Sequence, residues 1–150
     1  MRSELRTKVF IDTNVLIDVL LEGRPSTDAS KYIFQAVKDY TLEGVITVQS
    51  LIDAQYVLRK NKTVSLADFY RIIMQFSNYF NIEGLNFFDV RDACAHPSGD
   101  FEDDVQFARA KDGFCDYFIT GDRALIGRRQ NSLRPKILTP EEFIDLMQSE

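Results

Sequence analysis

The stretch VFIDTNVLIDVLLEG, residues 9–23, decides the fold because it joins a short apolar run to a polar turn and a largely apolar helix. Residues 9–11 are continuously apolar, which is typical of a buried strand. The run ends abruptly at Asp12, and the apolar segment behind it closes at Gly23, as helices often do. This stretch therefore predicts a buried strand, a polar turn and a buried helix in direct succession.

The rest of the chain repeats this alternation of short apolar runs and helical patterns. Further strands are expected at residues 45–48, 85–88, 117–120 and 135–138. Helices are expected at residues 26–40, 49–60, 65–80, 101–112 and 140–147. The alternation predicts one α/β domain over residues 1–150, built in three layers. Its mainly parallel sheet of about five strands would carry helices on both faces.

Composition narrows the class of protein. Of the 150 residues, 45% are hydrophobic and 27% are charged, which is ordinary for a globular domain and argues against a disordered tail. The apolar stretches are short and broken by charges, so we expect no membrane span and no signal peptide. Cys94 and Cys115 form no paired motif, which favours two free thiols in a reducing cytoplasm.

The chain is acidic, with 18 Lys and Arg against 23 Asp and Glu and a formal charge of −5. Proteins that coat nucleic acid are normally basic. An acidic protein can still act on nucleic acid if its carboxylates bind a metal ion, because the cation inverts the local field. The net charge therefore argues against a passive nucleic-acid binder and leaves a metal-dependent nuclease open.

Two aspartates come directly after predicted strands. Asp12 follows residues 9–11, and Asp122 follows residues 118–121. Strand ends of one polarity share one edge of a parallel sheet, and ligands bind there. Each residue alone could equally be a turn former or a helix N-cap. The pair together predicts two carboxylates on one rim.

Other acids lie on predicted helices. Asp53 shares a partly apolar face with Tyr56 and Val57, so it should point toward the body of the domain. In the helix expected at residues 101–112, Asp103 lies on the same face as Phe107 and Ala110, four and seven positions later, and this face should point inward. An inward acid is costly unless it is paired or binds a metal.

The neighbours of Asp103 have less specific patterns. Glu102 falls on a face that should point to solvent, and Asp104 lies between the two apolar rows of this helix, so its direction is ambiguous. Acids in a first helical turn are also explained by the helix dipole. Asp116 precedes the strand that Asp122 follows, so we expect it at the opposite edge of the sheet as a structural residue.

Several convergent carboxylates without His or Cys suit a hard cation such as Mg²⁺ or Mn²⁺. Such an ion lowers the pKa of a bound water and neutralises charge on a phosphodiester oxygen. Without it the acids repel one another, and one of them keeps its proton.

Four segments in this order resemble the successive motifs of the PIN domain, the fold of the VapC-type toxin ribonucleases. They are VFIDTNVLIDVLL, SLIDAQYVLRK, DFEDDVQFARA and CDYFITGDRAL, and together they cover nearly the whole chain. The resemblance implies that the family's acids fall on Asp12, Asp53, Asp103 and Asp122, and its neighbouring hydroxyl on Thr13. At position 53 the family usually has Glu, which is one methylene longer.

By the same resemblance, we expect a Mg²⁺- or Mn²⁺-dependent endoribonuclease that hydrolyses RNA and leaves a 5′-phosphate. It would be cytoplasmic, and possible roles include the toxin of a toxin–antitoxin pair. Relatives of this type form homodimers and are inhibited by a small antitoxin protein, so both partners are expectations here.

Residues beside the four acids have open roles. Asn14 could orient Asp12, contact phosphate or cap the following helix. Arg123 could contact phosphate, as could two basic groups, although both also fit plain surface: Arg59, Lys60 and Lys62, and Arg128 and Arg129. His96 is expected to be an exposed loop residue, and Asp18 a solvent-facing gap in an apolar helix or a weaker site candidate.

Two other functions are weighed against the nuclease. A degenerate PIN domain would bind RNA or a protein partner without cleaving, and Asp53 in place of Glu favours it. A phosphoryl-transfer enzyme of the haloacid dehalogenase type also begins with a strand that ends in Asp. That signature needs a second acid two residues later, where this chain has Asn14.

Overall fold

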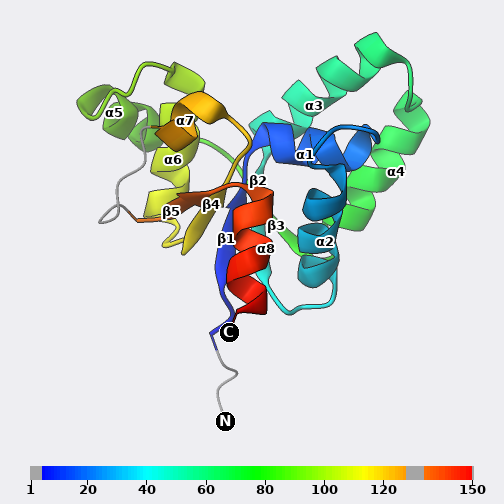
Figure 1. Ribbon diagram of the computed structural model, residues 1–150. Helices are drawn as coiled ribbons and strands as arrows, with labels where there is room; N and C mark the ends of the chain where they lie inside the picture. Colours follow the sequence, from blue (N-terminus) through cyan, green and yellow to red (C-terminus); the bar gives the residue numbers. More distant parts are fainter. Residues whose placement is uncertain (1–4, 128–133, 150) are drawn as a thin grey trace.

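The computed structural model describes residues 5–127 and 134–149. Within them, one parallel sheet has the strand order β3-β2-β1-β4-β5 (Figure 1). The strands are β1 (Lys8–Ile11), β2 (Glu43–Thr47), β3 (Phe80–Glu83), β4 (Tyr117–Ile119) and β5 (Lys136–Leu138). The predicted α/β class with a parallel, five-stranded sheet is confirmed.

Helices cover both faces of this sheet, so the protein has the three layers predicted (Figure 1). The helices are α1 (Thr13–Leu20), α2 (Thr27–Lys38), α3 (Val48–Asn61), α4 (Leu66–Phe76), α5 (Phe87–Ala95), α6 (Phe101–Asp112), α7 (Arg123–Gly127) and α8 (Pro140–Gln148). Helices α1, α2 and α8 pack on one face, with α3 and α4 beside them. Helices α5, α6 and α7 lie on the other side (Figure 1).

The alternating side chains of β1 divide the core into two clusters. Val9 and Ile11 point into the larger cluster, which includes residues of α1, α2, α3 and α8. Phe10 points into the smaller cluster, where its ring stacks on Phe118 at 5.1 Å between centroids. Because both faces of β1 are covered, its sequence is a continuous apolar run rather than an alternating one.

The third strand differs from the one expected at residues 85–88. It is β3, which pairs with β2 over Phe80–Glu83, and residues 87–88 instead begin α5. The reason is a capping box: Asn86 accepts a hydrogen bond from the backbone N–H of Asp89, and Asp89 accepts one from that of Asn86. Helix α4 ends at Phe76 rather than at about position 80, where β3 begins. Helices α5 and α7 are additions to the predicted helices.

The parallel arrangement separates the two edges of the sheet. At the amino-terminal edge, the Asp116 carboxylate accepts a hydrogen bond of 2.8 Å from the backbone N–H of Lys8, which begins β1. The predicted structural place of Asp116 is thus confirmed. The carboxyl ends of β1 and β4 lead into Asp12 and Asp122 at the other edge.

Gly44 on β2 packs closely against side chains of β3 and α2. A Cβ atom there would lie 2.6 Å from the Phe80 ring and 2.9 Å from a methyl group of Val37. Both side chains are buried, so neither can move aside freely. We expect Gly44→Ala to lower the free energy of unfolding by about 1–3 kcal/mol in urea titrations. Gly84→Ala is the control, because no atom lies within 4 Å of its new Cβ; equal losses for both variants would contradict this account.

The two cysteines are both free, and they differ in exposure. Cys94 on α5 is exposed, whereas Cys115 is buried before β4, where burial raises the pKa of its thiol to about 12. In the part of the chain that the structure describes, no helix is long and apolar enough to cross a membrane.

Candidate functional site

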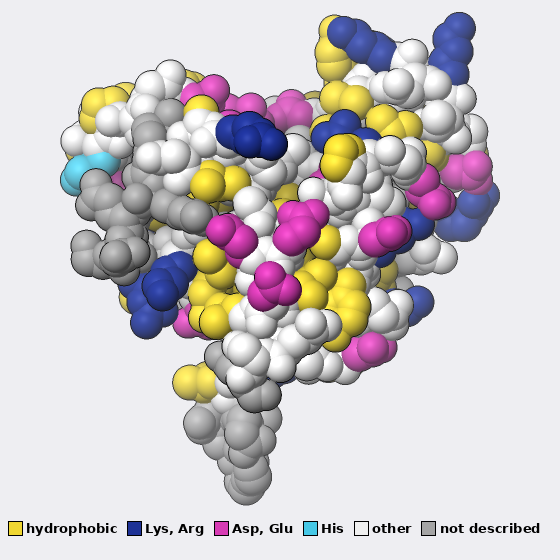
Figure 2. Space-filling view, viewed as in Figure 1, with side chains coloured by type: hydrophobic (Ala, Val, Ile, Leu, Met, Phe, Trp, Pro, Cys, Tyr) yellow, Lys and Arg dark blue, Asp and Glu magenta, His cyan; other side chains and the backbone are white. Residues whose placement is uncertain are grey.

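An acidic cleft of about 400 Å³ opens at the carboxyl ends of β1 and β4. Six acids line it together with polar and apolar neighbours: Asp12, Asp53, Asp100, Glu102, Asp103, Asp122, Thr13, Asn14, Ile17, Tyr56 and Val57. Asp53 and Glu102 share a hydrogen bond at one side of the cleft. Figure 2 shows Asp and Glu side chains along the upper rim of the molecule, between the places of α7 and α3 in Figure 1, and another group over α8. The cleft brings together all four acids that the sequence singled out.

Asp12 is the most deeply held acid of the cleft, with 4% of its surface exposed. Its carboxylate accepts hydrogen bonds from the backbone N–H of Thr13 at 2.8 Å, from Thr120 Oγ1 at 2.7 Å and from Asn14 Nδ2 at 3.1 Å. Burial nevertheless raises the pKa of this carboxyl above its usual value, and the charge of Asp122 acts in the same direction. The Asp12 carboxylate is therefore held in a fixed position, and a nearby positive charge would stabilise its ionised form.

Asn14 joins the ends of β1 and β4. Its Nδ2 donates to Asp12, and its Oδ1 accepts a hydrogen bond of 2.8 Å from the backbone N–H of Gly121. Of the roles that the sequence left open, the structure thus shows the orienting one. Because an amide lies at position 14, the second acid of the dehalogenase-type signature is missing.

Asp103 and Asp122 form the second part of the cleft. Asp103 is 7% exposed, which confirms that it faces inward from α6. Burial, the hydrogen bond with Asp122 and the negative charges of Asp12 and Asp122 together raise the pKa of Asp103 to about 8. Asp122 is positioned by its backbone N–H, which donates to Thr120 Oγ1 at 3.0 Å, and it caps α7 through Ala124.

Asp53 and Glu102 form the outer part. Burial, the hydrogen bond with Asp53 and the negative charge of Asp53 together raise the pKa of Glu102 to about 7. Gln49 Nε2 holds the other side of Asp53 at 2.9 Å. Glu102 was expected on a solvent face; it is exposed, but it lies over the cleft. Asp100 also lines the cleft and was missed, because its role as N-cap of α6 gives no separate signal in the sequence.

A buried polar network connects the elements that carry these acids. Thr13 Oγ1 and Ser50 Oγ share a hydrogen bond of 2.7 Å, and Gln106 Nε2 donates to Ser50 Oγ at 2.9 Å. Thr47 Oγ1 donates to Gln106 Oε1 at 3.1 Å. Gln106 is fully buried one turn after Asp103. The network therefore fixes α6 against the first turns of α1 and α3.

The donor set fits a hard divalent cation. The cleft offers carboxylate oxygens with raised pKa values, and a cation would relieve the repulsion that raises them. Within the described residues, the side chains are not arranged so that three or more His, Cys, Asp or Glu could hold a metal ion together. Side-chain adjustment on binding would be part of any metal site here.

Asp18 is not a solvent-facing gap, and it does not line the cleft. It is 6% exposed, and its carboxylate accepts hydrogen bonds from Arg24 Nε at 2.7 Å and Ser30 Oγ at 3.1 Å. Its backbone carbonyl accepts another from Thr27 Oγ1. The acid thus ties α1 to α2 and has a structural role, which explains its position in an otherwise apolar helix.

The remaining polar candidates lie around the cleft or away from it. Arg123 is exposed and directly follows Asp122 at the start of α7. Asp104 accepts hydrogen bonds from the backbone and side chain of Ser98. His96 is exposed and bonds Asp92, as expected for a loop residue. Arg59 and Lys60 lie over the Tyr56 ring, whereas Arg128 and Arg129 are outside the described residues.

The raised pKa values predict how pH changes stability without metal. In EDTA, we expect the melting temperature to fall as pH rises from about 4 to about 8. Asp103 holds its proton up to about pH 8 in the folded chain, against an ordinary value of 3.8, so the native state binds more protons in this window. Acids with a lowered pKa, such as Asp92, change the pH dependence of stability only below this pH window. Scanning calorimetry measures this effect. The melting temperature of Glu102→Gln should fall less over the same pH range than that of the wild type. A wild-type melting temperature that rises toward pH 8 would refute the raised pKa values of Asp103 and Glu102.

Known proteins share this architecture. The family model described as PIN domain matches residues 8–124. Among solved structures, a toxin–antitoxin complex from Klebsiella pneumoniae has a TM-score of 0.61 and 21% identity, covering 88% of this chain and 97% of that one. VapC20 from Mycobacterium tuberculosis, a toxin that cleaves the sarcin–ricin loop, has a TM-score of 0.61 and 15% identity, covering 79% of this chain and 95% of that one.

A Pyrobaculum aerophilum protein is similar to the same degree, with a TM-score of 0.62 and 15% identity, covering 96% of this chain and 97% of that one. At identities this low, the likeness shows a shared fold. No curated protein sequence matches the chain significantly.

Proposed function

Because the chain belongs to the PIN domain family, we propose that it is a metal-dependent endoribonuclease that hydrolyses RNA phosphodiester bonds. The observation that carries the proposal is the meeting of Asp12, Asp103 and Asp122 in one cleft, from elements far apart in the sequence. No fold requirement explains why the carboxyls of Asp12 and Asp103, both with raised pKa values, lie beside the Asp122 carboxylate. A site that binds a cation explains them.

In this proposal, Asp12, Asp103 and Asp122 would hold Mg²⁺ or Mn²⁺. Asp53 is one methylene shorter than the usual Glu, and it would act through water or at the edge of the site. When bound, the ion would lower the pKa of a water and neutralise charge on the phosphodiester.

The chain's own residues prepare the site for that ion. Thr13 and Asn14 fix Asp12 in one orientation through its two carboxylate oxygens. Thr120 holds Asp12 and Asp122 at once, because its hydroxyl donates to the first and accepts from the backbone N–H of the second. Arg123 would contact a phosphate of the RNA at the rim.

We further propose a role as the toxin of a toxin–antitoxin pair, in the cytoplasm, as a single domain. A small antitoxin protein and a second copy of the chain would be its partners. The shared fold with toxin structures supports this proposal.

The second candidate is a PIN domain that binds RNA or protein without cleaving. Asp53 favours it, because its shorter side chain already bonds Glu102 and Gln49 rather than reaching across the cleft. Cleavage of a fluorescent single-stranded RNA separates the two. We expect cleavage with Mg²⁺ or Mn²⁺, none in EDTA, and none with Asp12→Asn. RNA that stays intact with the wild-type chain and either metal would support the non-cleaving alternative.

A further inference from the structure

A second groove adjoins the acidic cleft. It measures about 540 Å³ and lies between α3, the segment after β3, and the first turns of α5 and α6. Its lining is mostly apolar, with two amide side chains and two acids: Leu85, Phe87, Val90, Phe101, Val105, Gln49, Asn86, Asp53 and Glu102. The apolar residues of the groove take no part in the function proposed above.

The groove and the cleft share one wall. Asp53 and Glu102 line both, so the two spaces are continuous across this pair of acids. A ligand that reaches across the wall must present an anionic or metal-binding group to the cleft and an uncharged, apolar group to the groove. A phosphodiester and the adjoining base of a nucleotide have this combination.

Two aromatic rings border the groove without belonging to the core. The side chains of Phe87 and Phe101 are 70% and 63% exposed. Each is the first residue of a helix whose cap fixes its backbone: Asn86 caps α5, and Asp100 caps α6. Firmly anchored, solvent-exposed rings are the kind of surface on which nucleobases stack.

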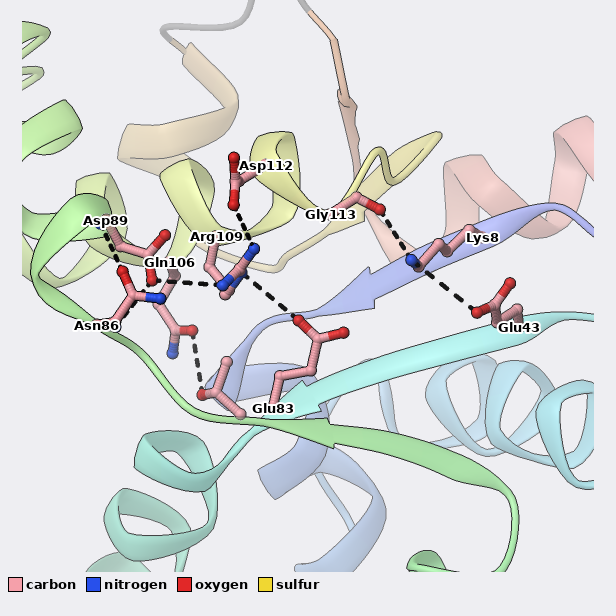
Figure 3. A network of polar contacts seen from close by, with 10 residues as sticks. Lys8, Glu43, Glu83, Asn86, Asp89, Gln106, Arg109, Asp112 and Gly113 are labelled. Carbon is pink, nitrogen blue, oxygen red and sulfur yellow. Dashed lines mark hydrogen bonds and ion pairs between the residues drawn. The ribbon is translucent and has the colours of Figure 1, made fainter.

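The rest of the groove suits a flat, uncharged ring. Val105 is buried at its floor, and Leu85 and Val90 are half-buried beside it. Asn86 accepts its capping hydrogen bonds through Oδ1, at 2.9 Å from the backbone N–H of Phe88, so its Nδ2 remains a donor. Figure 3 shows Asn86 where the chain enters α5. The acids at the wall disfavour a phosphate in the groove itself, because like charges repel.

We propose that this groove is a nucleobase subsite, in which Phe87 and Phe101 stack on an unpaired base next to the phosphodiester held in the acidic cleft. The inference rests on the proposed function and narrows its substrate class to RNA with at least one unpaired base beside the cut. A base inside a duplex remains stacked on its neighbours and is not available to both rings.

The test uses the full chain and a short single-stranded RNA in which one 2-aminopurine is moved from position to position. Stacking on an aromatic side chain quenches this fluorescent base, and the chain has no tryptophan to interfere. We compare the wild type with the double variant Phe87→Leu/Phe101→Leu. The matched control is Phe88→Leu/Phe114→Leu, since these rings are 67% and 87% exposed but do not line the groove.

We expect quenching at one position in the wild type and the control, and its loss in the Phe87→Leu/Phe101→Leu variant. For cleavage, KM should rise about tenfold in that variant, with kcat nearly unchanged, as for the loss of one stacked base. An abasic site at the quenched position should raise KM equally in the wild type and add nothing in the variant.

The results separate this inference from the nuclease proposal. Quenching that depends on the two rings, without cleavage by any preparation, would keep the subsite and reject the nuclease. Cleavage with equal KM and equal quenching in all three proteins would reject the subsite and keep the nuclease. If RNA handling is unchanged but sedimentation shows that the Phe87→Leu/Phe101→Leu variant loses self-association, the groove is a protein contact, and the subsite is refuted.

Discussion

Asp103→Asn is expected to reduce Mg²⁺- or Mn²⁺-dependent RNA cleavage by at least about 100-fold, because it removes a negative ligand from the proposed metal site. In metal-free buffer, the same variant should melt at the wild-type temperature or above it. Asn has no charge to bury, whereas Asp103 shares its cleft with Asp12 and Asp122, and its pKa is raised to about 8. The measurements are initial cleavage rates and calorimetry in EDTA above pH 8.

Asp112→Asn is the matched control, because it makes the same change on the same helix at a residue that is 72% exposed. It should retain cleavage. A large drop in the metal-free melting temperature of Asp103→Asn would contradict the prediction and would make Asp103 a structural residue.

Arg109→Met is expected to lower the free energy of unfolding by about 3 kcal/mol, the largest loss that we predict for a single polar side chain. Arg109 is 14% exposed and forms ion pairs with residues of three elements (Figure 3). They are Glu83 on β3 at 3.5 Å, Asp89 on α5 at 3.8 Å and Asp112 on α6 at 2.6 Å. Removing the guanidinium leaves the Asp89 carboxylate, 2% exposed, without its cation.

Lys111→Met provides the comparison on the same helix. Lys111 is 45% exposed and pairs with Asp92 at 2.9 Å, so its loss should cost less than about 1 kcal/mol. The double variant Arg109→Met/Asp89→Asn should recover part of the loss in urea titrations. If Arg109→Met and Lys111→Met unfold at the same urea concentration, the buried network contributes nothing.

Most of the acids in the cleft could be predicted from the sequence, because general rules of backbone geometry bring distant residues together. The parallel-sheet rule placed Asp12 and Asp122 at one edge, although 110 positions apart, and helical period turned Asp103 inward. Both rules work because they depend on backbone geometry, which the apolar pattern reveals. The resemblance to the PIN domain supplied the order of the motifs, and the family match agrees with it.

The errors came from polar residues whose partners the sequence does not identify. Asp18 looked like a gap in an apolar helix, because its partners Arg24 and Ser30 lie on the far side of a turn. Glu102 looked solvated, because the period of α6 cannot show that α3 passes near it with Asp53. Residues 85–88 were apolar enough for a strand, but Asn86 starts a helix there through its capping bonds.

The contrast between the two cysteines has a practical consequence. With one thiol accessible and the other sequestered at a pKa of about 12, a maleimide dye near neutral pH should attach to Cys94 alone. No engineered label site is required. Because Cys94 shares α5 with Phe87, the dye would sit on the helix that borders the nucleobase subsite and could report RNA binding in real time.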